Sequence, residues 1–543
     1  MIPHFLASDP TGATTAAAIL AVAAVALITS LFLFANAEAA DNEFTSVAHS
    51  RWATPADLVA RLPKKPEAQT TGTPATRENR ARLALDPSPF LGAFRDPLNR
   101  HAPPIDLRYT GEKNLLCFGA PGTSKSTALA AVNLLLLKRS AVVFDPKGQL
   151  YRITANARRR MGSKVILINP CGVLQDKCEG MESDGWNPLA ELDPQGRKFY
   201  SKAKTIADAI AEKTGNAKSD FFEDSMVELV TIFCMRERLE NGSKANLRNV
   251  RSAMSAPRAL FLAALNEMRT QDKYYSMKTS ASAAYNRLTD TSGQTTSLLD
   301  VISTTIKNTD FLNDDLIAED MDRGGGIDFA NMHDELTTVY VVLPMGELEN
   351  QKRYLRMFIN LAIESFFETS PPEPAPLPPV MMLLDECGNL GRLPQLLRAI
   401  TALRDYRVQL FLFFQGLGQL KKHYPHEEWS LFFACSGAIV NLAVGAANNN
   451  TSEHFSKALG RREVSMTSAN ISGAAAGGKG TTGGATVSTQ VFDLMPPEEF
   501  YRLRKGETIN IIEGCRYPVR GTALGYWQLF DESEVDPNPY YRG

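Results

Sequence analysis

The stretch GAPGTSKST, residues 119–127, follows the apolar run NLLCF and carries a lysine and a serine after a glycine-bearing turn. This order is close to the phosphate-binding pattern G-x-x-x-x-G-K-[ST], in which backbone N–H groups surround phosphates at the start of a helix. Gly119, Lys125 and Ser126 fit the pattern, but Ser124 stands at the position of the second glycine. If that position requires a left-handed backbone, a serine there costs roughly 1–2 kcal/mol. The sequence therefore predicts a nucleotide-binding loop with one unusual residue.

The side chains of this loop divide the work of holding a triphosphate. Lys125 is expected to reach the β- and γ-phosphates, and the Ser126 hydroxyl is expected to ligate Mg²⁺. The glycines allow the tight path of the chain. The candidate nucleotide-binding residues are Gly119, Ala120, Pro121, Gly122, Thr123, Ser124, Lys125, Ser126 and Thr127.

Two further apolar runs end in residues suited to the same chemistry. VMMLLDE, at 380–386, ends in Asp385 and Glu386, which are expected to hold Mg²⁺ and to activate the attacking water, respectively. VQLFLFFQ ends in Gln415, which is placed to sense the γ-phosphate. Arg404, eleven residues earlier, is either an arginine finger for a neighbouring subunit or part of a solvated helix face.

Short apolar runs bounded by turn residues alternate with helical patterns on both sides of a central helical region. This alternation predicts an α/β fold with a parallel sheet covered on both faces, interrupted by an inserted all-α domain. The expected strands lie at 114–119, 141–145, 165–169, 338–344, 380–385, 408–415, 437–442 and 508–514. Residues 472–490, rich in Gly and Thr, are expected to form a mobile surface loop.

The predicted organisation has six parts. They are an anchor at 1–40, an irregular linker at 41–104, the first part of the nucleotide-binding domain at 105–195, the all-α insertion at 196–322, the second part of the nucleotide-binding domain at 323–530, and a short acidic tail at 531–543. The 543 residues are too many for one compact core, and the seven singly scattered cysteines argue against zinc and against a disulfide framework.

The anchor is expected from the apolar stretch at about 16–37, which is long enough to span a bilayer. A secretory signal peptide is the alternative, because Ala35-Asn36-Ala37 resembles a cleavage site. The first 15 residues contain no Lys or Arg, which argues against a signal peptide. Basic residues follow the stretch, so a single-pass protein of the bacterial inner (cytoplasmic) membrane is expected, with most of the chain in the cytoplasm.

The motifs together resemble those of type IV coupling proteins, the TraG/TraD-like ATPases of conjugation and type IV secretion. The matching segments are HSRWATPADL (49–58), the loop at 119–127, VVFDPKGQLYRITA (142–155), WNPL (186–189), LLDECGNLGRLPQL (383–396), ALRDYRVQLFLFFQGLGQL (402–420), LGRREV (459–464) and LRKGETINIIEG (503–514). The resemblance implies a RecA-like P-loop NTPase fold with an all-α insertion. By position it assigns Lys125, Ser126, Asp385, Glu386 and Gln415 to the nucleotide site, and Arg404 to the trans-acting arginine.

The resemblance also implies partners and a function. Such proteins are membrane-anchored hexameric ATPases that use ATP and Mg²⁺, bring single-stranded DNA and its relaxase to the subunits of the secretion channel in the inner membrane, and drive DNA transfer. Three features depart from the family pattern: Ser124, one expected membrane helix instead of two, and no long C-terminal extension.

Net charge is −2, so contact with DNA is expected to use a local patch rather than the whole surface. Candidate clusters are Arg158-Arg159-Arg160, Lys421-Lys422 and Arg461-Arg462, each of which is more often a solvated surface. Two other functions stay open: a ring-shaped DNA translocase of chromosome segregation or repair, and a hydrolysis-deficient receptor that docks substrate on the channel. Ser124 is the feature that favours the receptor.

Overall fold

The computed structural model describes most of the chain beyond residue 49. The described residues are 50–59, 83–84, 86–96, 104–211, 217–289, 295–344, 348–369, 373–445, 449–472 and 482–540, with the single residues 76, 78, 99, 101, 346 and 371. The expected membrane anchor at 16–37 lies outside them. Among the described residues, the structure contains no helix that is both long enough and apolar enough to span a bilayer.

One eleven-stranded sheet organises the main body, with the strand order β2-β1-β13-β12-β9-β3-β8-β7-β4-β6-β5. The strands are β1 (Phe90–Phe94), β2 (Ile105–Arg108), β3 (Asn114–Phe118), β4 (Ala141–Phe144), β5 (Lys164–Ile168), β6 (Thr337–Val341), β7 (Val380–Leu384), β8 (Val408–Phe414), β9 (Ser436–Asn441), β12 (Glu507–Ile512) and β13 (Val519–Thr522). From β9 to β5 all neighbouring pairs are parallel. The eight strands expected from the sequence are therefore present, and the mixed α/β fold with a large parallel sheet is confirmed.

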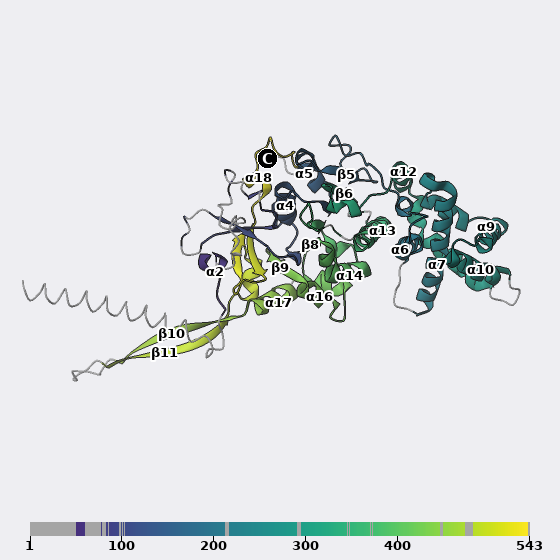
Figure 1. Ribbon diagram of the computed structural model, residues 1–543. Helices are drawn as coiled ribbons and strands as arrows, with labels where there is room; N and C mark the ends of the chain where they lie inside the picture. The colour runs from purple at the N-terminus through teal and green to yellow at the C-terminus, as the bar shows by residue number, and fades with distance from the viewer. Residues whose placement is uncertain are drawn as a thin grey trace, which may run out of the picture. The chain divides into compact units, whose positions relative to one another are not determined.

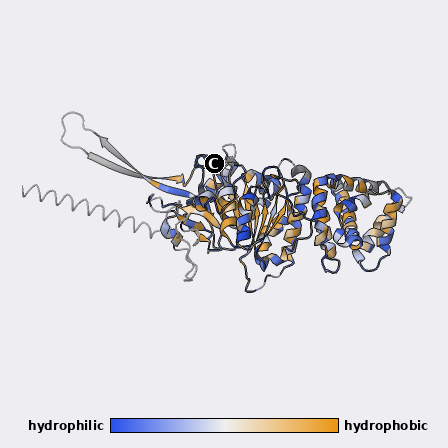
Figure 2. Cartoon of the chain, turned by 90° about the horizontal axis from the view of Figure 1, so that it is seen from above, coloured by the Kyte–Doolittle hydropathy of each residue, from blue (hydrophilic) through white to orange (hydrophobic). Residues whose placement is uncertain are grey.

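The parallel strands are mostly apolar because helices cover both faces of the sheet. Every residue of β3, β4, β7 and β8 is buried. Figure 2 shows hydrophobic residues concentrated along these central strands, with hydrophilic residues on the outer surfaces of the helices. A two-sided apolar environment is the physical reason that these strands are continuous hydrophobic runs rather than alternating ones.

The helices that flank the strands come from connections between them. They are α4 (Ala131–Leu136), α5 (Gln149–Arg160), α13 (Leu348–Phe367), α14 (Pro394–Ala402), α15 (Leu417–His423), α16 (Glu428–Ala434) and α17 (Asn449–Leu459), while α2 (Pro55–Val59) precedes the sheet and α18 (Tyr526–Leu529) follows its last strand. Helix α4 continues a π-helical turn at Ser126–Ala130, which starts directly after the loop at 119–125.

Between β5 and β6 the described residues that fold regularly are helical. The helices are α6 (Phe199–Ile210), α7 (Ala217–Asn241), α8 (Leu247–Met254), α9 (Arg258–Thr270), α10 (Tyr275–Thr289), α11 (Thr295–Asn308) and α12 (Asp315–Arg323). Helices α7, α9 and α10 lie together in Figure 1. An ion pair of 3.2 Å between Lys202 of α6 and Glu368, next to α13, joins this region to the helices of the sheet.

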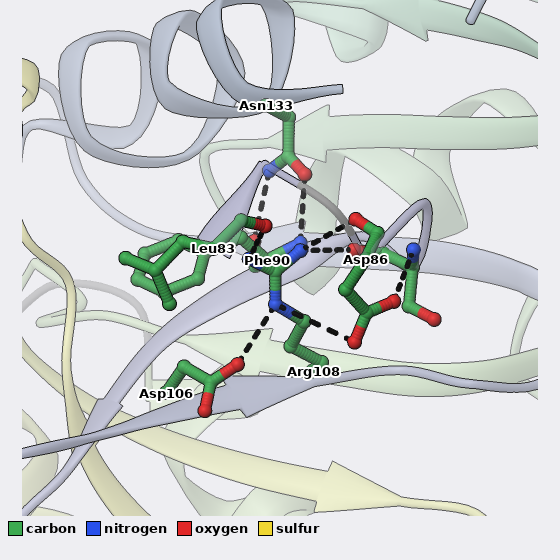
Figure 3. Close-up of polar contacts among 7 residues, drawn as sticks. Leu83, Asp86, Phe90, Asp106, Arg108 and Asn133 are labelled. Carbon is green, nitrogen blue, oxygen red and sulfur yellow. Dashed lines mark hydrogen bonds and ion pairs between the residues drawn. The ribbon is translucent and has the colours of Figure 1, made fainter. Parts of the chain in front are cut away.

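The antiparallel edge of the sheet corrects the expectation of an irregular linker that reaches residue 104. Residues 90–94 form β1, which pairs with β2 and β13. Arg108, 1% exposed, fixes this edge: it donates hydrogen bonds to the carbonyls of Leu83, Asp86 and Ser88 at 2.6, 3.1 and 2.8 Å. Its Nε also donates to Asp106 at 3.0 Å. Figure 3 shows the guanidinium at the centre of this network.

Asn133 of α4 ties the same edge to the helix that follows the predicted phosphate loop. Its Oδ1 accepts from the N–H of Phe90 and its Nδ2 donates to the carbonyl of Phe90, both at 2.8 Å (Figure 3). The short segment FLGAF therefore becomes a strand through contacts from residues that are distant in the sequence. These contacts leave no mark in the periodicity of residues 90–94 themselves.

A separate hairpin corrects the expectation of a mobile loop for residues 472 and 482–490, while residues 473–481 of that loop lie outside the described residues. Strand β10 (Arg461–Ser472) and strand β11 (Thr482–Asp493) pair antiparallel in unbroken register from Arg461↔Asp493 to Ser472↔Thr482. Figure 1 shows the two strands as a long ribbon. Residues 482–490 are thus part of a strand, although their Gly/Thr composition is typical of loops.

Candidate functional site

The predicted site residues gather where four parallel strands end. Strands β3, β8, β7 and β4 are consecutive neighbours in the sheet, and in parallel strands the carboxyl ends share one edge. The loop at 119–127 leaves β3, Gln415 follows β8, and Asp385 and Glu386 follow β7. Fold and strand order, rather than proximity in the sequence, bring these side chains together.

The loop adopts the path that a phosphate-binding loop requires. Gly122 and Ser124 both take left-handed backbone angles, with φ of 82° and 70°. The position that is usually glycine does therefore need a positive φ, and serine occupies it at a strain of roughly 1–2 kcal/mol. Lys125, 4% exposed, extends along the loop and donates from Nζ to the carbonyls of Gly119 and Ala120.

Contacts between distant segments join the loop to the acids. The Ser126 hydroxyl donates to Asp385 Oδ2 at 2.6 Å, although the two residues are 259 positions apart. Lys125 Nζ lies 3.9 Å from Glu386 Oε1. Gln415 Nε2 donates to Glu386 Oε2 at 2.7 Å. Lys125, Ser126, Asp385, Glu386 and Gln415 therefore form one cluster, as the sequence predicts.

Glu386 is held in an uncommon backbone conformation. Its φ of 56° is left-handed, a region that a glutamate enters at a cost of the order of 1–2 kcal/mol. The bond from Gln415 fixes one carboxylate oxygen, and the other faces Lys125. The strain and the paired contacts together aim the carboxylate across the end of the loop.

The Asp385 carboxylate has the properties of a cation ligand. Burial raises its pKa to about 6, and the negative charge of Glu386 adds to the rise, while the Ser126 hydroxyl and the charges of Lys125 and Lys147 oppose it. Its Oδ1 is buried and has no hydrogen-bond partner among the described residues. A hydroxyl and a carboxylate within hydrogen-bonding distance, with one oxygen unsatisfied, fit a hard divalent cation such as Mg²⁺.

The pocket at this loop is also lined by two residues that were not predicted as site residues, Lys147 and Gln149. It is lined by residues 120–127, Glu386, Lys147 and Gln149. Lys147 and Gln149 belong to the segment FDPKGQ, which follows β4, the strand next to β7. The signal that could have found them is this segment itself, since a polar turn at the end of a buried strand falls on the same edge as the loop.

Asp145, at the tip of β4, is the second buried acid at these strand ends. Burial raises its pKa to about 7, and the charge of Asp385 adds to the rise, while the N–H of Tyr151 opposes it by a hydrogen bond of 2.9 Å. Its Oδ1 is buried without a hydrogen-bond partner among the described residues. Two neighbouring strand tips thus end in buried carboxylates whose pKa values are raised.

Arg404 lies at the amino ends of the parallel strands, opposite the ends that form the pocket. It sits in a 3-10 turn, Leu403–Tyr406, before the amino end of β8, whereas Gln415 follows the carboxyl end. Seven strand residues at about 3.3 Å each separate the two ends by roughly 20 Å. Its side chain is 48% exposed and lies 3.5 Å from Asp405. Arg404 is therefore excluded from the pocket of its own chain.

The basic clusters proposed for DNA have local partners. Arg158 is 1% exposed and donates to the carbonyls of Leu137 and Arg139. Arg158 is therefore a structural residue, neither available to DNA nor part of a solvated surface, while DNA contact by the remaining residues of the clusters stays a prediction. Lys421 lies 4.6 Å from the ring centroid of Trp429, and Arg461 pairs with Asp493 at 3.3 Å.

Comparisons with known proteins bear on the family and the fold of the chain. The chain is 25% identical over 444 residues to the conjugal transfer protein TraG of Agrobacterium fabrum, covering 80% of this chain and 63% of that protein. It is 23% identical over 417 residues to the type IV secretion system-coupling protein VirD4 of Bartonella henselae, covering 74% and 61%. The chain thus spans a little over 60% of the length of these relatives.

Solved structures of the bacterial conjugative coupling protein TrwB share the fold. Unbound TrwB gives a TM-score of 0.57 at 14% identity, covering 90% of this chain and 96% of TrwB. TrwB in complex with a non-hydrolysable ATP analogue gives 0.56 at 15% identity, covering 89% and 96%. The family model for type IV secretory system conjugative DNA transfer matches residues 99–538. This chain therefore belongs to the type IV secretory system conjugative DNA transfer family.

Proposed function

We propose that the chain is a membrane-anchored, ATP-hydrolysing coupling protein that delivers DNA and its bound relaxase to a type IV secretion channel and drives conjugative transfer. The observation that carries the proposal is the junction of Ser126 and Asp385 at 2.6 Å, because it unites a phosphate loop with an acid from a distant strand. TrwB, which shares the fold, has been solved with ADP and Mg²⁺ and with a non-hydrolysable ATP analogue.

In this pocket the loop binds the phosphates and the acids prepare the reaction. The Lys125 amine would neutralise the β- and γ-phosphates. Ser126 and Asp385 would hold Mg²⁺, which would supply positive charge against the phosphate oxygens. Glu386 accepts a proton from the attacking water, while the amide of Gln415 keeps its carboxylate oriented. Gln415 lies close enough to Glu386 to link the state of the γ-phosphate to strand β8.

The position of Arg404 favours action between subunits. An exposed arginine at the amino edge of the sheet is remote from its own pocket, but it is accessible to a neighbouring copy. In a closed ring, each Arg404 would stabilise charge on the nucleotide of the adjacent subunit. A homo-hexamer that surrounds single-stranded DNA is the assembly proposed here, with residues 16–37 as its anchor in the inner membrane.

The left-handed backbone at Ser124 weakens the case for a hydrolysis-deficient receptor. Serine adopts the φ of 70° that the loop requires, so the substitution leaves the loop path intact. The receptor function then has no supporting feature at this loop. The cluster of Lys125, Ser126, Asp385, Glu386 and Gln415 therefore favours the coupling function.

ATP hydrolysis by the full chain in detergent, measured with and without single-stranded DNA, tests this proposal. The expected result is a Mg²⁺-dependent rate that DNA increases and that Lys125→Ala lowers by at least about 100-fold, as expected when a charge that acts on the transition state is lost. Lys164→Ala, an exposed lysine at the start of β5, is the matched control and should hydrolyse ATP like the wild type. Equal, near-zero rates for wild type and Lys125→Ala would contradict the enzyme and favour the receptor.

A further inference from the structure

The turn after β4 places two unassigned donors in the nucleotide pocket. Lys147 is exposed at the mouth, and Gln149 is 6% exposed; both line the pocket with the loop at 120–127 and Glu386. The Gln149 Nε2 is buried and has no hydrogen-bond partner among the described residues. A buried amide donor without an acceptor is costly, by roughly 1–3 kcal/mol, unless a ligand supplies one.

Lys147 and Glu386 line the same pocket, and Glu386 marks its acid end. Asp385 accepts from Ser126, and Glu386 faces Lys125 at 3.9 Å, so this end is where the terminal phosphate and the attacking water belong.

We propose that Lys147 and Gln149 form a second phosphate-binding arm, opposite the loop at 119–127, which contacts the terminal phosphate of the bound nucleoside triphosphate. The amine supplies charge and the amide supplies a directed hydrogen bond, the two kinds of donor that phosphate oxygens accept. This inference rests on the proposed ATP site, but it assigns residues that the proposed mechanism does not use.

The backbone of the arm is built for this placement. Gly148, between the two donors, has a φ of 67°, and a Cβ there would lie 3.1 Å from Met181 Cε and 3.3 Å from Leu174 Cδ1. The turn is closed by a hydrogen bond of 3.1 Å from the N–H of Gly148 to the carbonyl of Asp145. A glycine is needed for the turn to bring both donors to the same pocket.

The segment 531–540 holds the arm from outside. The Tyr540 hydroxyl donates to the carbonyl of Lys147 at 2.8 Å. Asp536 fastens the same segment to α5, because it accepts from Asn156 at 2.8 Å and lies 3.6 Å from Arg152. Tyr540 is therefore a positioning residue: through its bond to the backbone of the turn it holds Lys147, and Lys147 contacts the nucleotide.

Equilibrium binding of ATP and of ADP, each with Mg²⁺, to the full chain in detergent tests the arm. Lys147→Ala and Gln149→Ala should each weaken ATP binding about 10-fold and leave ADP binding within about twofold, since ADP lacks the terminal phosphate. Lys164→Ala should change neither. Unchanged ATP affinity in both arm variants, or an equal loss for ATP and ADP, would overturn the assignment. A wild type that binds neither nucleotide would instead contradict the proposed function.

A double-substitution cycle tests the role of Tyr540. Tyr540→Phe should weaken ATP binding two- to fivefold in the wild type and have no further effect in the Lys147→Ala background, because its hydroxyl acts through Lys147. Tyr200→Phe, another exposed tyrosine, is the control and should have no effect in either background. Equal effects of Tyr540→Phe in the two backgrounds would show that it does not act through the amine.

Discussion

Two regions of the sheet contrast in what their residues do for the fold: the carboxyl ends of the parallel strands, and the antiparallel strands at one side of the sheet. At the carboxyl edge of the parallel strands, Ser124 and Glu386 hold left-handed backbones, and Asp145 and Asp385 are buried with raised pKa values. At the antiparallel edge, Arg108 is buried too, but hydrogen bonds satisfy its guanidinium. The first region holds backbone strain and buried, uncompensated carboxylates where a ligand is expected to bind. The second region stabilises the fold and is not expected to bind a ligand.

Breaking the antiparallel edge should have the largest effect on stability. Arg108→Met leaves Asp106 and several carbonyls buried without their donor, which should lower the free energy of unfolding by about 3–5 kcal/mol. Denaturation in urea measures this loss. Arg520→Met, which lies on β13 of the same antiparallel edge and is half exposed, is the control and should change stability by less than about 1 kcal/mol. Equal stability of the two variants would contradict the structural role of Arg108.

The acid at the tip of β4 should affect stability in the opposite direction. Because burial raises the pKa of Asp145 to about 7, the folded chain binds more protons than the unfolded chain between about pH 4 and pH 7. Stability from this group is therefore fully present below pH 4 and is lost as the pH rises through about 7. The loss is of the order of 4 kcal/mol, since the pKa rises from 3.8 to about 7 and one pKa unit corresponds to about 1.4 kcal/mol.

Asp145→Asn removes this titration and tests it directly. The variant keeps an acceptor for the N–H of Tyr151. Relative to the wild type, it should gain stability on passing from pH 5 to pH 8, when both are measured without nucleotide. A difference between the two proteins that stays constant across this range would contradict a raised pKa at Asp145.

The smallest expected effect is at the unusual loop residue. Ser124→Gly removes the side chain that opposes a φ of 70° and should raise the free energy of unfolding by about 1 kcal/mol. Thr123→Gly, next to it and without a positive φ, should lower it by a similar amount, because glycine adds freedom to the unfolded chain. Loss of stability in both variants would show that Ser124 is not strained.

The same contrast explains what the sequence could predict. Strands β3, β4, β7 and β8 are continuous apolar runs, and the polar residues at their ends mark the site, so both were predictable from local pattern. Strands β1 and β2 are short, and β2 contains Asp106 and Arg108, whose burial depends on each other. Their strand character depends on contacts from α4 and β13, which no local pattern reveals.

The arm at Lys147 and Gln149 was missed for a related reason. Its role depends on β4 lying beside β7, and the order of strands in a sheet cannot be read from the runs themselves. The ribbon of β10 and β11 was missed because Gly and Thr in a segment without apolar alternation predict a loop. The role of Arg404 stays a prediction, since it depends on a second copy of the chain.

The Mg²⁺ dependence of ATP binding tests most directly whether the loop and the acids form one site. In the wild type, Mg²⁺ should strengthen ATP binding at least about 10-fold, as expected for a cation shared by phosphate and carboxylate. Asp385→Asn should lose most of this gain and keep the affinity measured without Mg²⁺, whereas Lys125→Ala should lose affinity in both conditions. A full Mg²⁺ gain in Asp385→Asn, with wild-type affinity in Lys125→Ala, would contradict the joint site.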